Sequence, residues 1–381
     1  MLAIGLMSGT SLDGIDAALV RITPSGASYA LELLNFATLP FDDELDTLLR
    51  AALPPHAPGP SAVAHLHHRL GSAFARAARM VAGALRVDYV ASHGQTIYHD
   101  GPRHFSVQIG DPFVIRETLN ATVIYDFRSG DCAAGGHGAP LVPYVDGLLL
   151  ASPSEDRVAL NVGGIANVTS LPAGCDPYDV MAFDCGPGVM LLDAFVQTRS
   201  EGELTMDVDG AFAAAGMHDG NLLRAMLGDD YFAQPPPKST GRERFGATFL
   251  AHHAATLGGL SLEDGCATLV EVTATAIAAA IVDLRMAHAR VLVSGGGARN
   301  LALLDRLRAM LPDAALEPTD AYGLPVDAKE AMAFAVLGYE TLRERAANVP
   351  RVTGASRAVP LGAIAPSDLR GLLAEVEREC R

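Results

Sequence analysis

The sequence predicts an α/β protein made of two duplicated domains, on three observations. Short apolar runs that end in glycine-rich turns and continue into helical segments recur along the chain, as in strand–turn–helix units. The opening pattern of strand, turn and strand at residues 2–22 returns at residues 157–172, about 155 residues later. With 381 residues, 49% of them hydrophobic, the chain is long enough for two or three domains with separate cores.

The first half of the chain predicts a hairpin, a third strand and then helices and strands in alternation. Clusters of Gly, Pro, Ser and Asp between the apolar runs give the turns. The predicted elements are a hairpin at residues 2–22, a strand at 29–41, helices within 41–86 with a proline-rich break at 53–60, a buried strand ending in a polar loop at 86–96, a turn and helix at 104–120, a strand at 121–131, and a glycine-rich loop and helix at 131–150.

The second half repeats this order. After the second hairpin, residues 179–195 predict a strand, turn and helix, and residues 289–307 predict a strand, glycine turn and helix equivalent to the segment 86–96. One such unit is common by chance in α/β chains, but two element types recurring in one order favour duplication. We expect an N-terminal domain at residues 1–130 and a C-terminal domain at residues 131–381, with the last helix returning to the first domain.

The charge and the cysteine content exclude several classes of function. Acidic residues outnumber basic residues by 44 to 28, a net charge of −16, so general binding of nucleic acid or of anionic membranes is not expected. The longest apolar stretch, Val272 to Val282, is too short to cross a bilayer, and the N-terminus does not resemble a signal peptide. The five cysteines contain no C-x-x-C pair, which argues against a disulfide framework or structural zinc. We expect a cytoplasmic protein.

Asp184 is the candidate catalytic residue. It ends the apolar run 180–183 and precedes a Gly-Pro-Gly turn and a predicted helix. A carboxylate at a strand end beside such a turn lies where α/β proteins bind their ligands. The alternative is that Asp184 caps the helix, which its distance from the first helical residues makes less favourable.

Glycine-rich turns and polar strand ends supply candidate binding residues. The turns at residues 9–16 and 295–297 could hold phosphate on backbone N–H groups, or could be simple tight turns; the Walker A pattern is absent. The polar side chains suit a sugar with many hydroxyls, and an arginine suits its carboxylate. These polar candidates at strand ends are His93, Gln95, Thr96, Arg128 and Asp131, although His93 could also be an ordinary loop histidine. Lys238, Arg242 and Glu243 form one of the few basic spots of the chain, which could contact ATP phosphates or the base, or could be a rigid interdomain loop. Glu330, in a predicted helix, could face the ligand cleft or be a surface residue.

Taken together, the motifs resemble those of the anhydro-N-acetylmuramic acid kinases, which belong to the actin-like ATPase superfamily. The most specific are the proline-rich YFAQPPPKSTGRE segment and the pair DFR and GAPLVP. The matches follow the family's order over nearly the whole chain: GLMSGTSLDGID, SHGQTI, QIGDP, DFRSGDCAAGGHGAPLVP, NVGGIANVT, FDCGPG, YFAQPPPKSTGRE, SGGGARN and KEAMAFAVLG.

The resemblance implies two actin-like (ribonuclease H-like) domains with an ATP cleft between them. It implies a kinase that opens the ring of 1,6-anhydro-N-acetylmuramic acid with water and phosphorylates O6 with ATP in peptidoglycan recycling. Asp184 is then the general base, Mg²⁺ is held mainly through the nucleotide phosphates rather than at a protein site, and the enzyme is a homodimer.

The resemblance also implies a set of binding residues. The sugar residues are His93, Gln95, Thr96, Arg128 and Glu330. The nucleotide residues are Gly9, Thr10, Ser11, Leu12, Asp13, Gly14, Ile15, Asp16, Gly163, Gly164, Gly186, Gly295, Gly296 and Gly297. Cys185, Val189 and His137 replace the Thr, Asn and Gln usual in the family, which puts the fine substrate preference in question.

Two other functions fit the same residues. One is a kinase of another sugar or acid, in which Asp184 deprotonates a hydroxyl and no water is added. The other is an ATP-gated regulator without catalysis, although the sequence shows no peptide-binding region or polymer-forming insertion.

Overall fold

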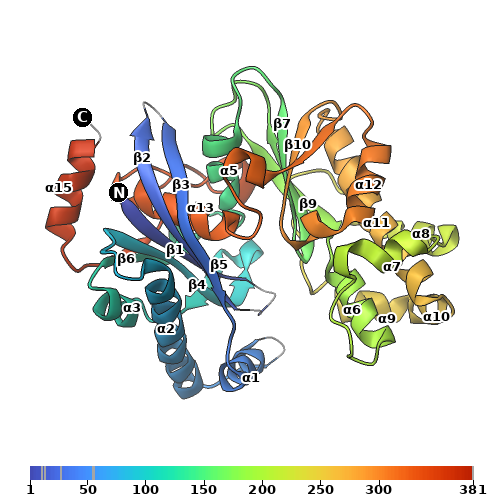
Figure 1. The fold of residues 1–381 in the computed structure, drawn as a ribbon, viewed down its shortest axis with the longest axis horizontal. Helices are drawn as coiled ribbons and strands as arrows, with labels where there is room; N and C mark the ends of the chain where they lie inside the picture. Colours follow the sequence, from blue (N-terminus) through green and yellow to red (C-terminus); the bar gives the residue numbers. More distant parts are fainter. Residues whose placement is uncertain (10–11, 13, 26–27, 54–55, 380–381) are drawn as a thin grey trace. The chain divides into compact units, whose positions relative to one another are not determined.

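The computed structural model describes residues 1–9, 12, 14–25, 28–53 and 56–379 (Figure 1). The chain forms two compact units: unit 1 comprises residues 1–149, 177–179 and 328–381, and unit 2 comprises residues 150–176 and 180–327. The expected boundary at residue 130 and the assignment of all later residues to the second domain therefore differ from the structure. The reason is packing, because residues 131–149 and 328–379 have their contacts in unit 1.

Unit 1 contains a mixed sheet. In its described part the sheet has seven strands in the order β12–β6–β4–β1–β2–β3, with β5 paired to β4 outside this path. The first three strands are antiparallel, whereas β4 runs parallel to β1, and β6 parallel to β4. The strands are β1 (Leu2–Ser8), β2 (Ile15–Ser25), β3 (Ser28–Leu39), β4 (Tyr89–Asp100), β5 (Phe105–Ile109), β6 (Thr122–Tyr125) and β12 (Ala363–Ala365).

Two helices cover opposite faces of this sheet. Ile4 and Leu6 pack in one core with the apolar side of α2, whereas a Cβ on Gly5 would lie 1.7 Å from the carbonyl oxygen of Ala331 in α13. Neighbouring residues of a strand face opposite sides, so α2 and α13 lie on different faces. The helices of this unit are α1 (Asp43–Ala52), α2 (Pro60–Ala82), α3 (Pro112–Leu119), α4 (Ser129–Ala133), α5 (Val142–Leu150), α13 (Lys329–Leu342), α14 (Pro350–Thr353) and α15 (Leu369–Glu379), with the short η1 (Gly101–Arg103).

Unit 2 contains a second mixed sheet. Its strand order is β11–β10–β7–β8–β9. The strands are β7 (Arg157–Val162), β8 (Ile165–Leu171), β9 (Met181–Pro187), β10 (Arg290–Ser294) and β11 (Ala315–Pro318). The helices are α6 (Met190–Arg199), α7 (Ala211–Ala215), α8 (Gly220–Leu227), α9 (Ala247–His252), α10 (Ala254–Gly258), α11 (Leu262–Asp283) and α12 (Leu301–Met310), with the short turns η2 (Val208–Gly210), η3 (Gly296–Arg299) and η4 (Thr319–Tyr322).

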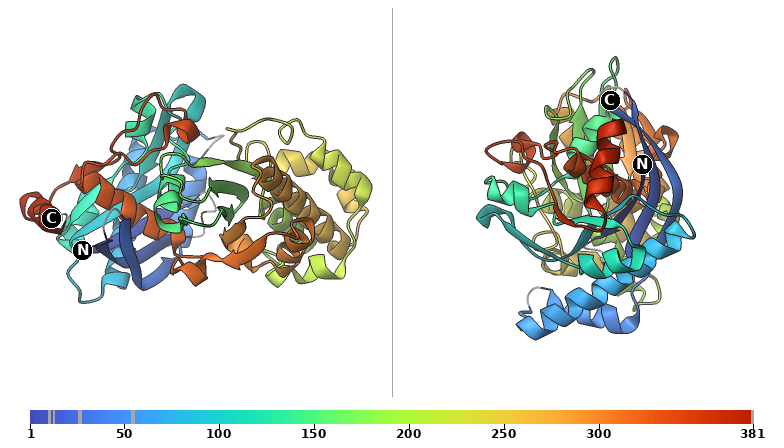
Figure 2. Two further views of the ribbon diagram at one scale, coloured as in Figure 1. Left: turned by 90° about the horizontal axis from the view of Figure 1, so that it is seen from above. Right: turned by 90° about the vertical axis from the view of Figure 1, so that its left-hand side faces the viewer.

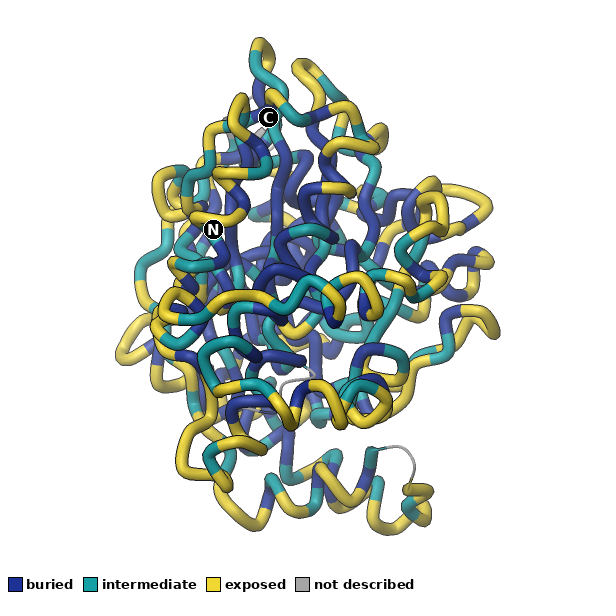
Figure 3. Tube along the Cα trace, turned by 90° about the vertical axis from the view of Figure 1, so that its right-hand side faces the viewer, coloured by how far each residue is buried: buried dark blue, intermediate teal, exposed yellow. Residues whose placement is uncertain are grey.

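The helix α11 is the central helix of unit 2. By length and composition it could cross a membrane, but 78% of its most apolar window is buried inside the protein. Residues such as Val272, Ile277 and Ile281 are fully enclosed in the unit 2 core. The burial explains the apolar run at 272–282 as core packing. Figure 3 shows the same distribution along the chain, with buried strands and with exposed residues in the loops and outer helices.

The two sheets have the same topology. The order β3–β2–β1–β4–β6 of unit 1 matches the order β9–β8–β7–β10–β11 of unit 2, and the sheet of unit 1 has β5 and β12 in addition. The first three are antiparallel in both, and the last two run parallel to the first. This agreement in order and direction confirms the predicted duplicated α/β architecture.

The first residue of the chain lies against the last described helix, α15, in unit 1. The ammonium group of Met1 is 3.0 Å from a carboxylate oxygen of Glu379 in α15 and donates to the carbonyl oxygen of Ile22. Figure 2 shows the N-terminus beside this last helix. The last helix thus packs on the first strands of the chain.

Candidate active site

A β-bulge in β4 places the polar side chains of the SHGQT segment. Leu6 pairs with Ser92 and Ser8 pairs with Gln95, so two residues of β4 lie opposite one residue of β1. Gly94 has a φ of +75°, and a Cβ there would lie 2.9 Å from the carbonyl oxygen of Ile109. A bulge redirects the side chains beside it. The segment predicted as a loop is therefore part of a strand that continues to Asp100.

His93 is buried and holds Arg128. Its Nδ1 lies 2.8 Å from the carbonyl oxygen of Gly94, and its Nε2 lies 3.1 Å and 2.9 Å from Nε and Nη2 of Arg128. Because a guanidinium only donates, Nε2 is the acceptor and Nδ1 carries the hydrogen. Burial, and then the charge of Arg128, lower the pKa of His93 to about 3. His93 is therefore neutral near pH 7 and orients the arginine.

The glycine-rich loop holds the other end of Arg128. Nη1 of Arg128 donates to the carbonyl oxygen of Gly138 over 2.7 Å. The N–H of Gly138 donates to Asp131 over 2.8 Å, and this fully buried carboxylate also accepts from Asn348 and Thr353. Asp131, a polar candidate in the sequence, thus fixes the loop that fixes Arg128.

Glu330 belongs to the same electrostatic neighbourhood in unit 1. It lies in the first turn of α13, and burial raises its pKa; the charges of Lys329 and Arg128 lower it, and that of Asp16 raises it. The close approach of Gly5 to Ala331 places the first turn of α13 against the middle of β1. The charges of Asp16 and Arg128, which belong to two other segments, therefore act on the carboxyl group of Glu330.

Gln95 lies at the base of the first glycine turn. Its Nε2 donates to the carbonyl oxygens of Gly9 and Thr96, each over 3.2 Å, and its Oε1 is 2.6 Å from Oγ of Ser8. The Ser8 Oγ is also 2.8 Å from the carbonyl oxygen of Gly14. The side chain of Gln95 is fully buried. Both of its amide hydrogens are occupied within the protein, which leaves none for the predicted contact with a sugar.

Other predicted residues of the first turn differ in their surroundings. Leu12 has a φ of +61° and is buried, and a Cβ on Gly14 would lie 2.5 Å from the carbonyl oxygen of Leu39. Ile15 starts β2, and Asp16 accepts from the hydroxyl of Thr38 over 2.5 Å. Thr96 accepts from Gln108 over 3.2 Å. Thr10, Ser11 and Asp13 lie outside the described residues.

In unit 2 the two predicted glycine turns lie side by side. A Cβ on Gly295 would lie 2.5 Å from the side chain of Asn161, and one on Gly297 would lie 2.3 Å from Val162, at the end of β7 that leads into Gly163 and Gly164. By contrast, a Cβ on Gly296 would meet no atom within 4 Å. Close packing thus explains why residues 295 and 297 are glycines. At Gly296 the position that a Cβ would take is open.

Asp184 lies inside β9 rather than at the predicted strand end. Asn167 pairs with Asp184 and Ala166 pairs with Gly186, so Cys185 is the extra residue of a β-bulge and the strand continues to Pro187. The first residues of α6 begin later, and the residue that caps this helix is Val189. The alternative in which Asp184 caps α6 is therefore excluded.

The proline-rich segment holds Asp184 in place. The N–H of Thr240 donates to Oδ2 of Asp184 over 2.9 Å, the N–H of Asp184 donates to the carbonyl oxygen of Lys238 over 3.1 Å, and the hydroxyl of Tyr231 donates to the Asp184 carbonyl oxygen over 2.8 Å. Burial raises the pKa of Asp184 to about 6, against the Thr240 hydrogen bond, which lowers it; Glu243 adds a smaller increase. A carboxylate of this kind is a suitable general base near neutral pH.

Comparisons with known proteins identify the family. The family model described as anhydro-N-acetylmuramic acid kinase matches residues 1–367. The chain belongs to this family. The anhydro-N-acetylmuramic acid kinase of Streptomyces coelicolor is 42% identical over 96% of this chain and 94% of its own length. That of Xanthomonas axonopodis pv. citri is 45% identical over 96% and 98%, and that of Pseudomonas paraeruginosa is 42% identical over 96% and 98%. The resemblance stated from the motifs is confirmed.

Within the anhydro-N-acetylmuramic acid kinase family, Gly186 and Cys185 of this chain have packing roles. Gly186 is buried, and a Cβ there would lie 2.7 Å from the ring of Phe232, which explains the glycine without a nucleotide contact. Cys185 is 2% exposed, and burial raises the pKa of its thiol. A buried neutral thiol is unreactive, so the cysteine acts as an apolar packing residue beside Asp184.

The site of this family member includes groups that the sequence did not reveal. The Thr240 N–H is a backbone donor, which any residue type could supply, and the Thr240 hydroxyl oxygen is buried without a hydrogen-bond partner in the part of the chain described. Lys238, predicted as a basic spot for phosphate, donates instead to the carbonyl oxygens of Tyr231 and Phe232 over 3.1 Å and 3.3 Å. Burial lowers the pKa of this lysine.

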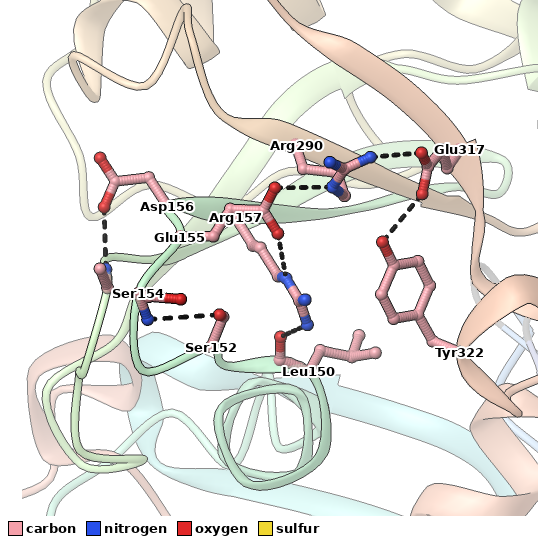
Figure 4. Close-up of polar contacts among 10 residues, drawn as sticks. Leu150, Ser152, Ser154, Glu155, Asp156, Arg157, Arg290, Glu317 and Tyr322 are labelled. Atoms are coloured by element: carbon pink, nitrogen blue, oxygen red, sulfur yellow. Dashed lines mark hydrogen bonds and ion pairs between the residues drawn. The ribbon is translucent and has the colours of Figure 1, made fainter.

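Two further arginines of unit 2, Arg157 and Arg290, lie away from its glycine turns. Arg157 and Arg290 start β7 and β10, whereas the glycine turns follow the ends of these strands. Figure 4 shows both arginines bonded to Glu155, at 3.1 Å and 2.8 Å, and Arg290 also bonded to Glu317. These arginines are neutralised at the opposite end of the sheet. Among the residues described, no cluster of three or more His, Cys, Asp or Glu side chains could hold a metal ion.

Proposed function

We propose that this protein phosphorylates 1,6-anhydro-N-acetylmuramic acid with ATP while water opens the anhydro ring, giving N-acetylmuramic acid 6-phosphate and ADP. The observation that carries the proposal is Asp184. It is a half-buried carboxylate that a backbone N–H holds at one oxygen and whose pKa is raised to about 6, in a chain of the anhydro-N-acetylmuramic acid kinase family. Such a group is charged at pH 7 to 8 and still basic enough to take a proton.

Asp184 acts on the water that attacks the sugar. The water oxygen forms a bond to C1, the bond between C1 and O6 breaks, and O6 takes the γ-phosphoryl group of ATP. The proton that the water loses goes to Asp184. Because Thr240 holds Oδ2, the other carboxylate oxygen, Oδ1, is the one that faces the water. The bonds from Tyr231 and to Lys238 keep the backbone of Asp184 fixed during this step.

Arg128 and Glu330 bind the sugar. Nε and one hydrogen of Nη2 are directed at His93, and one hydrogen of Nη1 is directed at Gly138. The remaining hydrogens of Nη1 and Nη2 receive the carboxylate of the substrate's lactyl group. Glu330, whose pKa is raised by burial, accepts hydrogen bonds from the sugar. His93 contributes by orienting Arg128. Base and sugar-binding residues must act on one molecule at once, and we therefore propose that the ATP cleft closes during turnover.

The glycine turns bind ATP through the backbone. The chain has a net charge of −16, and ATP is anionic, so backbone N–H groups of residues 9–16, 163–164 and 295–297 provide the attraction. Mg²⁺ bound to the phosphates neutralises the charge that develops during transfer. The open side of Gly296 suits the close approach of a ligand to the backbone. We further propose a cytoplasmic homodimer that acts in peptidoglycan recycling, which light scattering and cell fractionation test.

The decisive test follows the oxygen of water and the loss of Asp184. In ¹⁸O-water the product carries label at C1, and the substrate gains the mass of one water and one phosphoryl group. Asp184→Asn lowers kcat by about 10²- to 10⁴-fold and retains binding of ATP and sugar by calorimetry. The matched control is Asp193→Asn, another unit 2 carboxylate whose pKa burial raises to about 6; this variant keeps its activity. An unlabelled C1 would refute ring opening by water. An Asp184→Asn variant with unchanged activity would refute the assignment of Asp184 as the general base.

A further inference from the structure

Two buried polar side chains, those of Ser8 and Gln95, lie at the base of the first glycine turn. The pairing of β1 with β2 ends at Met7 and Asp16, so the residues at both ends of the turn lie beyond the strand ladder. Ser8 and Gln95 pair with each other across β1 and β4 at this point. Both side chains are buried, Ser8 at 2% exposure and Gln95 at 0%. Polar groups buried this deeply require hydrogen-bond partners.

The partners of Ser8 and Gln95 are the two ends of the turn. Gln95 Nε2 donates to the carbonyl oxygen of Gly9 over 3.2 Å, and Ser8 Oγ lies 2.8 Å from the carbonyl oxygen of Gly14. The contact of 2.6 Å between Ser8 Oγ and Gln95 Oε1 joins the two side chains. The single hydroxyl hydrogen of Ser8 serves Gly14 and Gln95 in alternation. The pair thus closes the turn at its first and last residue.

The orientation of the Gln95 amide follows from its surroundings. With Nε2 toward Gly9 and Thr96, both amide hydrogens meet carbonyl oxygens, each at 3.2 Å. The reverse orientation would place Oε1 against the same two acceptors. No donor of Gln95 is therefore left for a sugar hydroxyl.

We infer that Gln95, with Ser8, is a positioning residue for the nucleotide phosphates and not a residue that contacts the sugar. A peptide group is planar, so a hydrogen bond to the carbonyl oxygen of Gly9 fixes the orientation of the peptide group to which this carbonyl belongs. A phosphate cradle made of backbone N–H groups works only when successive planes keep one orientation. The clamp therefore acts on nucleotide affinity through the turn. The inference rests on the proposed function for the identity of the ligand.

The test separates nucleotide affinity from sugar affinity. Gln95→Met keeps the length of the side chain and removes its donors and acceptor. Binding of a non-hydrolysable ATP analogue with Mg²⁺, measured by calorimetry, weakens about tenfold or more, while binding of 1,6-anhydro-N-acetylmuramic acid changes less than about twofold. The matched control is Gln108→Met on the adjacent β5, whose side chain bonds Thr96 and Ser106 and does not touch the turn; this variant binds the analogue as the wild type does.

A second variant covers the case in which Gln95→Met does not fold. Ser8→Ala removes the contacts to Gly14 and Gln95 but adds no bulk, and it weakens analogue binding in the same direction. Unchanged analogue binding in both variants, or a loss of sugar binding alone, would overturn the inference. Analogue binding does not depend on turnover, so wild-type protein that binds the analogue but does not phosphorylate the anhydrosugar would refute the proposed function and leave this test intact. Wild-type protein that binds no analogue would overturn both.

Discussion

The turn at residues 9–14 of unit 1 and the turn at residues 163–164 of unit 2 occupy the same place in two sheets of one topology, yet they are held in different ways. In unit 1, the side chains of Ser8 and Gln95 hold both ends of the turn. In unit 2, backbone holds it: the N–H groups of Gly188 and Val189 donate to the carbonyl oxygens of Gly164 and Gly163 over 2.8 Å and 2.9 Å.

The difference follows from the length of the turns. The pairing of β7 with β8 continues to Val162 and Ala166, directly beside the short turn. The pairing of β1 with β2 stops at Met7 and Asp16, and the longer turn begins beyond it. A short turn is defined by its own strands, whereas a long turn has more conformations to restrict. Duplication of a fold therefore repeats the scaffold but not the contacts that support its loops.

The largest expected effect comes from breaking the backbone support in unit 2. A Cβ on Gly188 would lie 2.1 Å from the carbonyl oxygen of Gly163, and a backbone atom cannot give way as a flexible side chain does. Gly188→Ala is expected to lower the free energy of unfolding by about 3 kcal/mol or more, measured by urea denaturation. Gly164→Ala is the control, because its Cβ would meet only the end of the Met190 side chain, at 3.2 Å. Equal losses in both variants would contradict the backbone support.

The pH dependence of activity distinguishes the ionisable residues of the two units. The pKa of Asp184 is raised from 3.8 to about 6, and that of His93 is lowered to about 3. A base must be charged, so kcat/KM is expected to be constant above pH 7 and to fall about tenfold per unit below pH 6. His93 is neutral throughout this range and contributes no change. An acidic limb near pH 6 that shifts in His93→Gln would contradict the assignment to Asp184.

The same pKa of Asp184 predicts an effect on stability. Between pH 4 and pH 6 the folded protein binds more protons at Asp184 than the unfolded chain does, because the folded pKa is the higher one. This group therefore lowers stability as the pH rises through that window. Asp184→Asn is expected to raise the free energy of unfolding at pH 8 by about 1 to 2 kcal/mol, measured by urea denaturation. A less stable Asp184→Asn would show that the charged carboxylate is compensated in the folded state.

The smallest expected effect concerns the open glycine of unit 2. A Cβ on Gly296 would meet no atom within 4 Å, so Gly296→Ala is expected to change the free energy of unfolding by less than about 1 kcal/mol. The added methyl group lies where the proposed nucleotide approaches, and the KM for ATP is expected to rise severalfold while kcat is retained. Gly258→Ala, in α10 and equally open, is the control with an unchanged KM. An unchanged KM in Gly296→Ala would remove this turn from the nucleotide site.

Local patterns in the sequence predicted much of the fold and part of the site. The alternation of apolar runs and glycine turns gave the duplicated order of strands, because strand period and turn residues are local properties. The helices within residues 41–86, with their proline-rich break, agree with α1 and α2. Asp184 could be selected because its residue type and its place before a Gly-Pro-Gly turn are both visible in the sequence.

Tertiary structure decided the rest, because the relevant contacts join distant segments or use the backbone. The boundary of unit 1 depends on α13 packing against Gly5, and the bond from Thr240 to Asp184 comes from a backbone N–H. Gln95 and Lys238 were predicted as ligand-binding residues from their polar types. In the structure they donate to the carbonyl oxygens of Gly9 and Tyr231 instead, so both side chains stabilise the backbone. The sequence alone determined the fold class and the family, and it selected Asp184 as the residue that we propose as the base. Only the fold determined which polar groups remain for ligands, since a hydrogen that is already bonded within the protein is not available to a ligand.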